Sequence, residues 1–433
     1  MNTSETNGAC NCSAHLSRRT LIKAAGLSGI AWLTPVAELL AREEEQLPKG
    51  GTAKSVIVLW MQGGPSQLET FDPHPGKMIA GGTGAIKTRA SGIQLATGME
   101  QLADQMDSIS IVRSVTSREG DHERATYNMK TGYRPDPTVV HPSIGAVICH
   151  EIPDTKVEIP RHVSILPGQW PARGGYFGDQ YDAFKVFDPQ SRVQDTKLRV
   201  TDERHTARMK DLDVLERGFR KGRMKDLDKN KTLHRSTINA AMMMISSDQL
   251  DAFEVSEVPE KERLAYGDNP FGRGCLAARR LVEVGVRCVE VTLSGWDTHI
   301  NNHENHKPLV ARLDTGFAAL IRDLKERKLL DNTIVLCGGE FGRTPKINGA
   351  DGRDHWPHGF SIALAGGGIR GGHAVGETDP DGSKKIKGAV AVDDIHTTVL
   401  HALGVNHKRV INTPIGRPMK ISEGSIVKGL LQA

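Results

Sequence analysis

The feature of this sequence that most constrains its fold is an alternation of short apolar runs with helical repeats. Residues 286–292 and 333–337 are apolar and rich in β-branched side chains, as in buried strands. Between them, apolar residues recur every three or four positions, the spacing of one helix face, at Leu309, Leu313, Phe317, Leu320 and Leu324. Strands that alternate with helices in this way predict an α/β fold with a doubly wound, mainly parallel sheet and helices on both faces.

The same pattern extends to both sides of this region. Further strands are expected at residues 55–60, 109–112 and 361–365. Residues 275–284 suit a helix, and a last helix is expected to start at a cap on Asp393 or Asp394 and to end at Gly404. With 433 residues, the chain is long enough for one large core and an insertion.

The first 41 residues have the features of an export signal. Arg18 and Arg19 precede a mildly apolar stretch, residues 24–37, which is shorter than the roughly 20 strongly apolar residues of a membrane span. Small residues near Ala37 and Ala41 favour cleavage there. We therefore predict a twin-arginine signal that exports a folded protein to the periplasm or beyond. The alternative is an amphipathic N-terminal helix of a cytoplasmic protein.

The mature part is predicted to be one domain, residues 42–433. Residues 191–267 are rich in charged side chains with apolar residues at helical spacing, which predicts a helical insertion outside the sheet. The net charge is +4 and no basic stripe with interleaved aromatic residues is present, which argues against a nucleic-acid partner. Four cysteines without metal-type spacing are expected to be free, buried thiols: Cys149, Cys275, Cys288 and Cys337.

Polar side chains concentrate next to the predicted strands, where ligands of α/β sheets bind. Three segments qualify, residues 294–299, 338–345 and 353–358, and they supply the candidate metal ligands Asp297, His299, Glu340, Asp354, His355 and His358. Mixed carboxylate and imidazole ligands favour a transition metal, with zinc or manganese as the expected ion. Arg343 is a candidate catalytic residue that would neutralise an oxyanion. The alternative is that these side chains only make hydrogen bonds within loops.

Several of these segments resemble the DUF1501 family, a group of exported, sulfatase-like proteins placed in the alkaline phosphatase superfamily. The resemblance covers nearly all of the mature chain and rests on four motifs: Gln62-Gly63-Gly64-Pro65-Ser66, Thr70-Phe71-Asp72-Pro73, Trp296-Asp297-Thr298-His299 and Gly339-Glu340-Phe341-Gly342-Arg343-Thr344-Pro345. It implies an alkaline-phosphatase-like doubly wound sheet. In active relatives it also implies a metal centre that hydrolyses or transfers phosphate or sulfate esters.

Gln62 and His122 depart from the pattern that the resemblance implies, as does Glu340-Phe341, which stands where an Asp-His pair often follows a strand. Gln62 stands where superfamily enzymes place an aspartate ligand at the end of the first strand. His122 stands where the nucleophile is expected, ten residues before Gly132. Three roles remain open for His122: an imidazole nucleophile, a metal ligand, or part of a binding site without catalysis. Packing within the loop is the simpler alternative.

These observations lead to two hypotheses. The first is an exported, metal-dependent hydrolase of phosphate or sulfate esters, whose substrate is a small molecule or a polysaccharide. The second is a non-catalytic binding or scaffold protein of the cell envelope that keeps the sulfatase-like fold and contacts a partner protein or a carbohydrate. Metal content and ester turnover distinguish the two.

Overall fold

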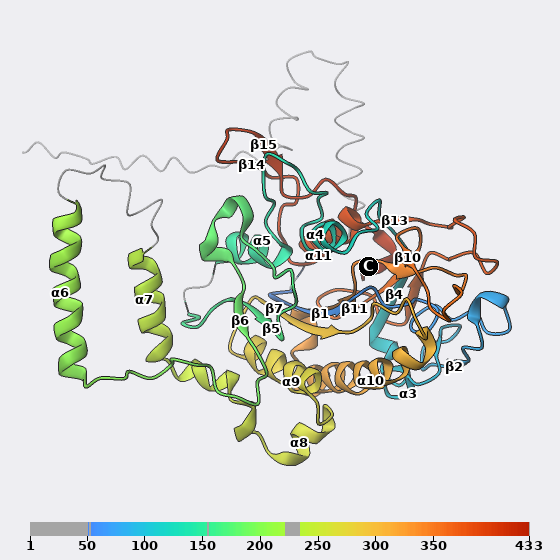
Figure 1. Ribbon diagram of the computed structural model, residues 1–433, viewed down its shortest axis with the longest axis horizontal. Coiled ribbons are helices and arrows are strands. Elements are labelled where there is room, and N and C mark those ends of the chain that lie inside the picture. Colours follow the sequence, from blue (N-terminus) through green and yellow to red (C-terminus); the bar gives the residue numbers. More distant parts are fainter. Residues whose placement is uncertain (1–50, 52, 154–155, 221–233, 433) are drawn as a thin grey trace, which may run out of the picture. The chain divides into compact units, whose positions relative to one another are not determined.

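The computed structural model describes residues 51, 53–153, 156–220 and 234–432 (Figure 1). The predicted signal segment, residues 1–41, lies outside them. The strands are β1 (Ser55–Gln62), β2 (Ala85–Lys87), β3 (Gln94–Ala96), β4 (Ile109–Thr116), β5 (His162–Ile165), β6 (Phe184–Val186), β7 (Cys288–Ser294), β8 (Thr333–Gly338), β9 (Gly342–Arg343), β10 (His355–Trp356), β11 (Phe360–Ala365), β12 (His373–Val375), β13 (Val390–Ala391), β14 (Val410–Asn412) and β15 (Pro418–Lys420). The α-helices are α3 (Glu100–Ala103), α4 (His122–Thr131), α5 (Ile144–Glu151), α6 (Asp202–Arg220), α7 (His234–Ile245), α8 (Glu260–Ala265), α9 (Pro270–Glu283), α10 (Asn302–Glu326) and α11 (Val392–Ala402).

A nine-stranded sheet forms the centre of the described part of the chain. Its order is β12-β4-β11-β8-β1-β7-β5-β6, and β13 pairs with β4. All of its pairs are parallel except those of β11, which runs antiparallel to both β4 and β8. The predicted α/β fold with a mainly parallel sheet is therefore confirmed.

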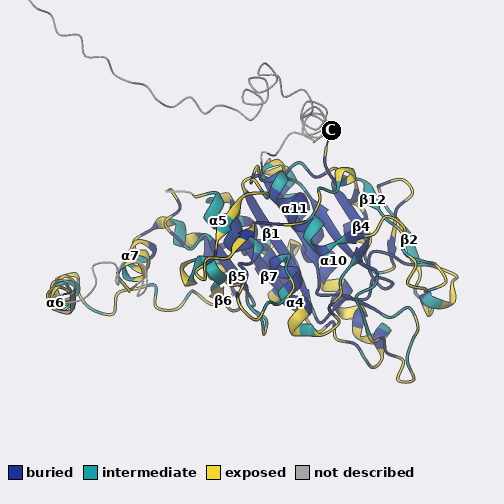
Figure 2. Cartoon of the chain, turned by 90° about the horizontal axis from the view of Figure 1, so that it is seen from above, coloured by how far each residue is buried: buried dark blue, intermediate teal, exposed yellow. Residues whose placement is uncertain are grey.

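Both faces of the sheet are buried, and β1 shows why. Successive side chains of a strand point to opposite faces. Ile57, Leu59 and Met61 belong to one core cluster, together with apolar residues of α9 and α10. Val56, Val58 and Trp60 belong to the other, together with residues of α4, α5 and α11. In Figure 1 the two groups of helices lie on opposite sides of the sheet, and Figure 2 shows the strands buried between them.

Strand direction determines which loops meet. Strands β1, β4, β7 and β8 run in the same direction, so their carboxyl ends lie at one edge of the sheet. Because β11 runs the opposite way, its amino end lies at that same edge. This edge therefore brings together the residues that follow β1, β4, β7 and β8 and the residues that precede β11.

Two local predictions meet different outcomes. Cys149, Cys275, Cys288 and Cys337 are free and buried, as expected. The predicted cap of the last helix is wrong, because β13 runs straight into α11 and the extended residue Ala391 takes the N-cap position. Asp394 lies one turn further on, where its carboxylate accepts a hydrogen bond from the Ala391 amide at 3.0 Å.

Residues 191–267 contain the helices α6, α7 and α8 among the described residues, and we propose that this segment is an insertion into the domain. None of the described helices combines the length and the apolar character that crossing a lipid bilayer requires.

Candidate metal-binding site

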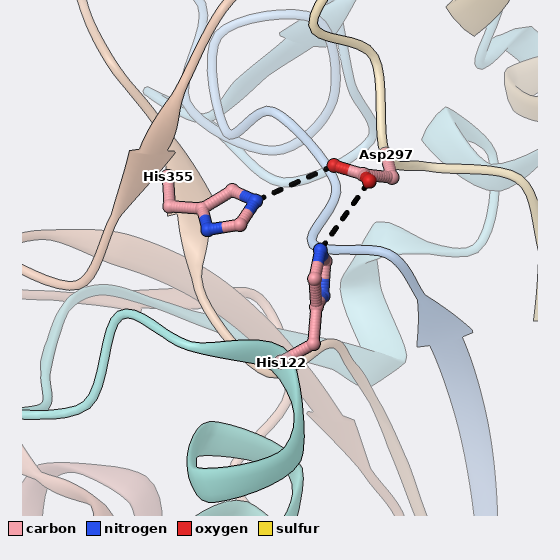
Figure 3. Close-up of side chains that lie close together, drawn as sticks. All are labelled: His122, Asp297 and His355. Atoms are coloured by element: carbon pink, nitrogen blue, oxygen red, sulfur yellow. Dashed lines mark hydrogen bonds and ion pairs between the residues drawn. The ribbon is translucent and has the colours of Figure 1, made fainter. Parts of the chain in front are cut away.

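Three histidines and one aspartate converge at the edge of the sheet where these strand ends meet. His122 is the first residue of α4, after β4, and Asp297 and His299 lie in the loop after β7. His355 lies in the short strand β10, just before β11. Figure 3 shows the rings of His122 and His355 directed at the carboxylate of Asp297.

The carboxylate of Asp297 is the centre of this cluster. Its Oδ2 lies 3.4 Å from Nε2 of His122, and its Oδ1 lies 3.2 Å from Nε2 of His299 and 3.4 Å from Nε2 of His355. The Nε2 atoms of His299 and His355 are 3.1 Å apart. All three imidazoles therefore present the same ring nitrogen to one small space.

The other ring nitrogen of each histidine is already engaged. Nδ1 of His122 lies 2.8 Å from Oε1 of Glu340, and Nδ1 of His299 lies 2.8 Å from Oδ1 of Asp354. Nδ1 of His355 lies 2.8 Å from the carbonyl oxygen of Gly120. These oxygens accept hydrogen bonds, so each Nδ1 carries a proton and Nε2 is the ring nitrogen that faces the cluster. Histidines that bind metals have this arrangement.

The spacing of these atoms suits a small metal ion. For Zn–N bonds of about 2.0–2.1 Å, neighbouring ligand atoms in a tetrahedral site are about 3.3–3.4 Å apart. The contacts around Asp297 fall at 3.2–3.4 Å. Donor atoms of His122, Asp297 and His355 all lie within 4.8 Å of one another. The Nε2 atom of His122 is buried and has no hydrogen-bond partner, which a bound ion would supply. The residues present therefore fit a divalent metal.

The surroundings of the cluster shift the pKa values of its side chains in different directions. The hydrogen bond that His122 donates to Glu340 raises the pKa of His122, although burial opposes it. Burial raises the pKa of Asp297, but the hydrogen bond and the charge of Arg343 outweigh it and hold that pKa below its usual value. Burial lowers the pKa of His355. The hydrogen bond to His299 lowers the pKa of Asp354.

Arg343 lies in a different place from the one expected of an oxyanion clamp. Its side chain is fully buried. Its Nε donates to the carbonyl oxygen of Gly64 at 2.8 Å, its Nη1 to that of Arg353 at 3.0 Å, and its Nη2 to that of Gly63 and, at 2.5 Å, to Oδ1 of Asp297. A guanidinium enclosed in this way positions Asp297 and joins three loops, and its catalytic role stays a prediction.

Glu340 also differs from its expected role as a ligand. The side chain is fully buried behind His122, and its Oε1 accepts a hydrogen bond from the Gly63 amide at 2.9 Å as well as the contact from Nδ1. It therefore supports the imidazole from the side opposite Asp297. Glu340 lies behind His122 because it follows the buried end of β8. The periodicity of the sequence does not reveal this burial.

His358 lies apart from the cluster. Its ring packs edge-on against Trp356 at 5.1 Å between ring centroids, and it lines a small cavity with Gln67 and Thr378. We leave it out of the metal set, because its ring packs on Trp356 and lines that cavity rather than the cluster around Asp297.

Sequence reasoning did not single out two aromatic residues at the site. Phe341 packs against the His355 ring at 4.3 Å between centroids, and Trp170 lies nearly parallel to the His122 ring at 6.4 Å. Phe341 follows the predicted ligand Glu340 directly, which was a usable signal. Trp170 comes from the loop after β5, which carries none of the motifs.

Comparisons with solved structures find similar proteins. The chain is similar to the lipoteichoic acid synthase LtaP from Listeria monocytogenes, with 10% identity, coverage of 88% of this chain and 78% of that chain, and a TM-score of 0.41. It is similar to an alkaline phosphatase mutant of the Antarctic bacterium TAB5, with 12% identity, coverage of 83% and 100%, and a TM-score of 0.38. It is also similar to the sulfatase PsFucS1 from Pseudoalteromonas sp., with 15% identity, coverage of 86% and 71%, and a TM-score of 0.37.

A search of curated protein sequences finds no match. The family model of DUF1501, described as a protein of unknown function, matches residues 53–431. This match spans all the strands of the central sheet and every residue of the cluster around Asp297. The chain therefore belongs to the DUF1501 family.

Proposed function

We propose that this protein is an exported, metal-dependent hydrolase of phosphate or sulfate esters. The observation that carries the proposal is the convergence of three Nε2 atoms on the Asp297 carboxylate while each Nδ1 is engaged elsewhere. In their neutral form these rings direct Nε2 lone pairs at the carboxylate, and a cation between them would offset the repulsion. The DUF1501 resemblance supports ester chemistry.

We assign the ion to His122, Asp297 and His355. Three protein ligands with one open position are typical of catalytic zinc sites, and two imidazoles with a carboxylate also suit manganese. A divalent ion held by these residues would supply Lewis-acid chemistry towards an ester oxygen and a water molecule. His122 stands where the hydroxyl or thiol nucleophile is expected and would serve as one of the ligands.

His299 is assigned to proton transfer rather than to the ion. Its side chain is 43% exposed, and Asp354 holds its Nδ1 so that Nε2 faces the cluster. An imidazole in this orientation can take a proton from water or give one to the leaving alcohol at Nε2. The carboxylate of Asp354 stabilises the imidazolium that forms when the ring accepts this proton.

Metal content and turnover test the proposal. The purified protein is expected to hold zinc or manganese by elemental analysis and to hydrolyse p-nitrophenyl phosphate or p-nitrophenyl sulfate, with activity lost in chelator. His122→Ala and His355→Ala should each lose the metal. His358→Ala is the matched control and should retain it. A wild-type protein without metal and without turnover contradicts the proposal.

The second candidate is a binding or scaffold protein of the envelope. It is favoured by Gln62 at the end of β1, where the resemblance implies an aspartate ligand, and by His122 in the place of the nucleophile. Metal binding by the wild type without turnover of either ester would support this function.

Export is the remaining part of the proposal. It is supported by Arg18 and Arg19 ahead of the apolar stretch at residues 24–37. Replacing both arginines by lysine should keep the full chain in the cytoplasmic fraction of cells that export the wild type. Unchanged export of the double variant argues against the twin-arginine route.

A further inference from the structure

A tryptophan from outside the motifs lies against the imidazole of His122. Trp170 belongs to the loop that follows β5, and its side chain is half-buried. Its indole is inclined by only 12° to the imidazole of His122, with 6.4 Å between ring centroids. Phe341 packs near the same ring at 5.0 Å, and Glu340 holds its Nδ1. A carboxylate and two aromatic rings thus lie around the imidazole of His122.

A buried ion pair holds the backbone of Trp170. The ammonium of Lys130 donates to the carbonyl oxygen of Trp170 at 2.9 Å and to Oε1 of Glu290 at 2.9 Å. Both charged side chains are almost fully buried, at 9% and 5% exposure. Ser164 donates to the same Glu290 oxygen at 3.2 Å, and the ammonium lies 5.1 Å from the ring centroid of Trp60. A lysine held in this way has little freedom to release the carbonyl.

Stability alone does not account for this ion pair. Taking two charges out of water is unfavourable, and replacing a buried pair by apolar residues of similar volume is often neutral or stabilising. The Lys130–Glu290 pair also holds the backbone carbonyl of Trp170 through a hydrogen bond. Apolar residues in the same place could not make this bond.

The ion pair stands on the two elements that carry the proposed metal ligands. Helix α4 begins with His122 and has Lys130 in its last turn, so the helix sets the separation of the two residues at about 12 Å. Strand β7 carries Glu290 and leads into the loop of Asp297. Lys130 and Glu290 therefore fix Trp170 relative to the same helix and strand that position the cluster.

A third contact restrains the same loop. The side chain of Gln62, at the end of β1, packs on the Cα atom of Gly168, where an added Cβ would lie 1.7 Å from Oε1 of Gln62. The loop thus approaches the sheet edge closely two residues before Trp170.

We propose that Trp170 is a positioning residue that keeps the imidazole of His122 directed at Asp297, and that the Lys130–Glu290 pair fixes Trp170 through its carbonyl group. The inference rests on the proposed function, because the orientation of His122 is assigned to metal binding. It also makes a claim of its own: removing Trp170 or the ion pair exposes His122.

Two readouts test this proposal separately from the proposed function. The first is the rate at which diethyl pyrocarbonate modifies His122, followed by peptide mass spectrometry, which needs neither metal nor turnover. The second is the affinity for Zn²⁺, measured by competition with a chromophoric chelator. The variants are Trp170→Ala, Trp170→Phe and the double variant Lys130→Met/Glu290→Gln, which removes both charges and keeps the volume. Trp356→Ala is the matched control, because Trp356 packs on His358.

We expect His122 to react several-fold faster in Trp170→Ala and in the double variant, and Zn²⁺ binding to weaken about tenfold, as for residues that orient metal ligands. Trp170→Phe should restore most of both properties, because an aromatic ring is retained, and Trp356→Ala should match the wild type. An unchanged modification rate in Trp170→Ala overturns the inference whether or not Zn²⁺ binds. Faster modification in a protein that binds no Zn²⁺ supports the positioning role and contradicts the proposed function instead.

Discussion

The carboxylate of Glu340 lies 2.8 Å from Nδ1 of His122, on the side of the imidazole away from Asp297. This contact joins residues 218 positions apart in the sequence. It places a buried negative charge behind a ring whose Nε2 faces the cluster. A carboxylate in this position fixes the tautomer of a histidine ligand and increases its basicity.

Glu340 should therefore influence metal affinity without binding the metal. We expect Glu340→Gln to weaken Zn²⁺ binding about tenfold, and Glu340→Ala by up to about 100-fold, because the amide oxygen of glutamine can still accept a hydrogen bond. Chelator competition measures both affinities. If Glu340 were instead a ligand, both variants would lose the metal to the same extent as His122→Ala.

Arg343 should matter for folding rather than for ester binding. In Arg343→Lys the carbonyl oxygens of Gly63, Gly64 and Arg353 lose donors inside the protein, at about 1–3 kcal/mol for each buried group left unsatisfied. Urea unfolding should show the decrease in the free energy of unfolding. Arg312→Lys, an exposed helix position, is the control and should be neutral. Wild-type stability with a raised KM would indicate that Arg343 contacts the ester after all.

Gly63 should not tolerate any other residue, for two reasons. Its φ is positive, and the backbone at Asp297 approaches it closely. Its φ is +115°, and an added Cβ would lie 2.4 Å from the Asp297 amide nitrogen. Gly82 has φ +95° with nothing within 4 Å of an added Cβ, so it separates the two effects. Gly82→Ala should lose only about 1–3 kcal/mol of stability through strain. Gly63→Ala should lose more and also weaken Zn²⁺ binding. Unfolding and chelator competition measure the stability and the Zn²⁺ affinity of both variants. If the two variants lose equal amounts of each, the close approach of Gly63 to Asp297 has no effect of its own.

His396 should make the protein less stable in mild acid. Burial lowers its pKa to about 4, from an ordinary value of 6.5, and its Nε2 donates to the Met129 carbonyl at 2.8 Å. The unfolded chain therefore takes up a proton near pH 6.5, whereas the folded protein takes it up only near pH 4. The free energy of unfolding is unaffected above about pH 6.5 and falls towards pH 4, by about 3 kcal/mol for this group.

The variant His396→Gln isolates this contribution. Glutamine keeps a donor for Met129 but does not titrate, so the stability of the variant should fall less steeply between pH 6.5 and pH 4. Urea unfolding across this range measures the slope. Parallel curves for wild type and variant would show that His396 is not the titrating group.

The strands and helices around the site were predictable from local patterns. The apolar run at residues 55–60 became β1, and the helical repeat between Leu309 and Leu324 lies within α10. The polar segments after β7 and β8 were predicted to lie at one edge of the sheet, and they do. The roles within these segments were less predictable, because Glu340 and Arg343 are buried while Asp297 and His299 face solvent.

The α/β alternation, the mainly parallel sheet and the candidate Asp and His segments could be read from the sequence, because periodicity and the polarity of strand ends are local properties. Three features became visible only in the folded chain: His122 joins Asp297 and His355, Glu340 contacts the imidazole of His122, and Trp170 lies beside the same ring. Strand order and the reversed direction of β11 arise from long-range backbone pairing, which no local pattern encodes. Whether a polar side chain faces the cluster or lies buried behind it follows from that pairing and from packing.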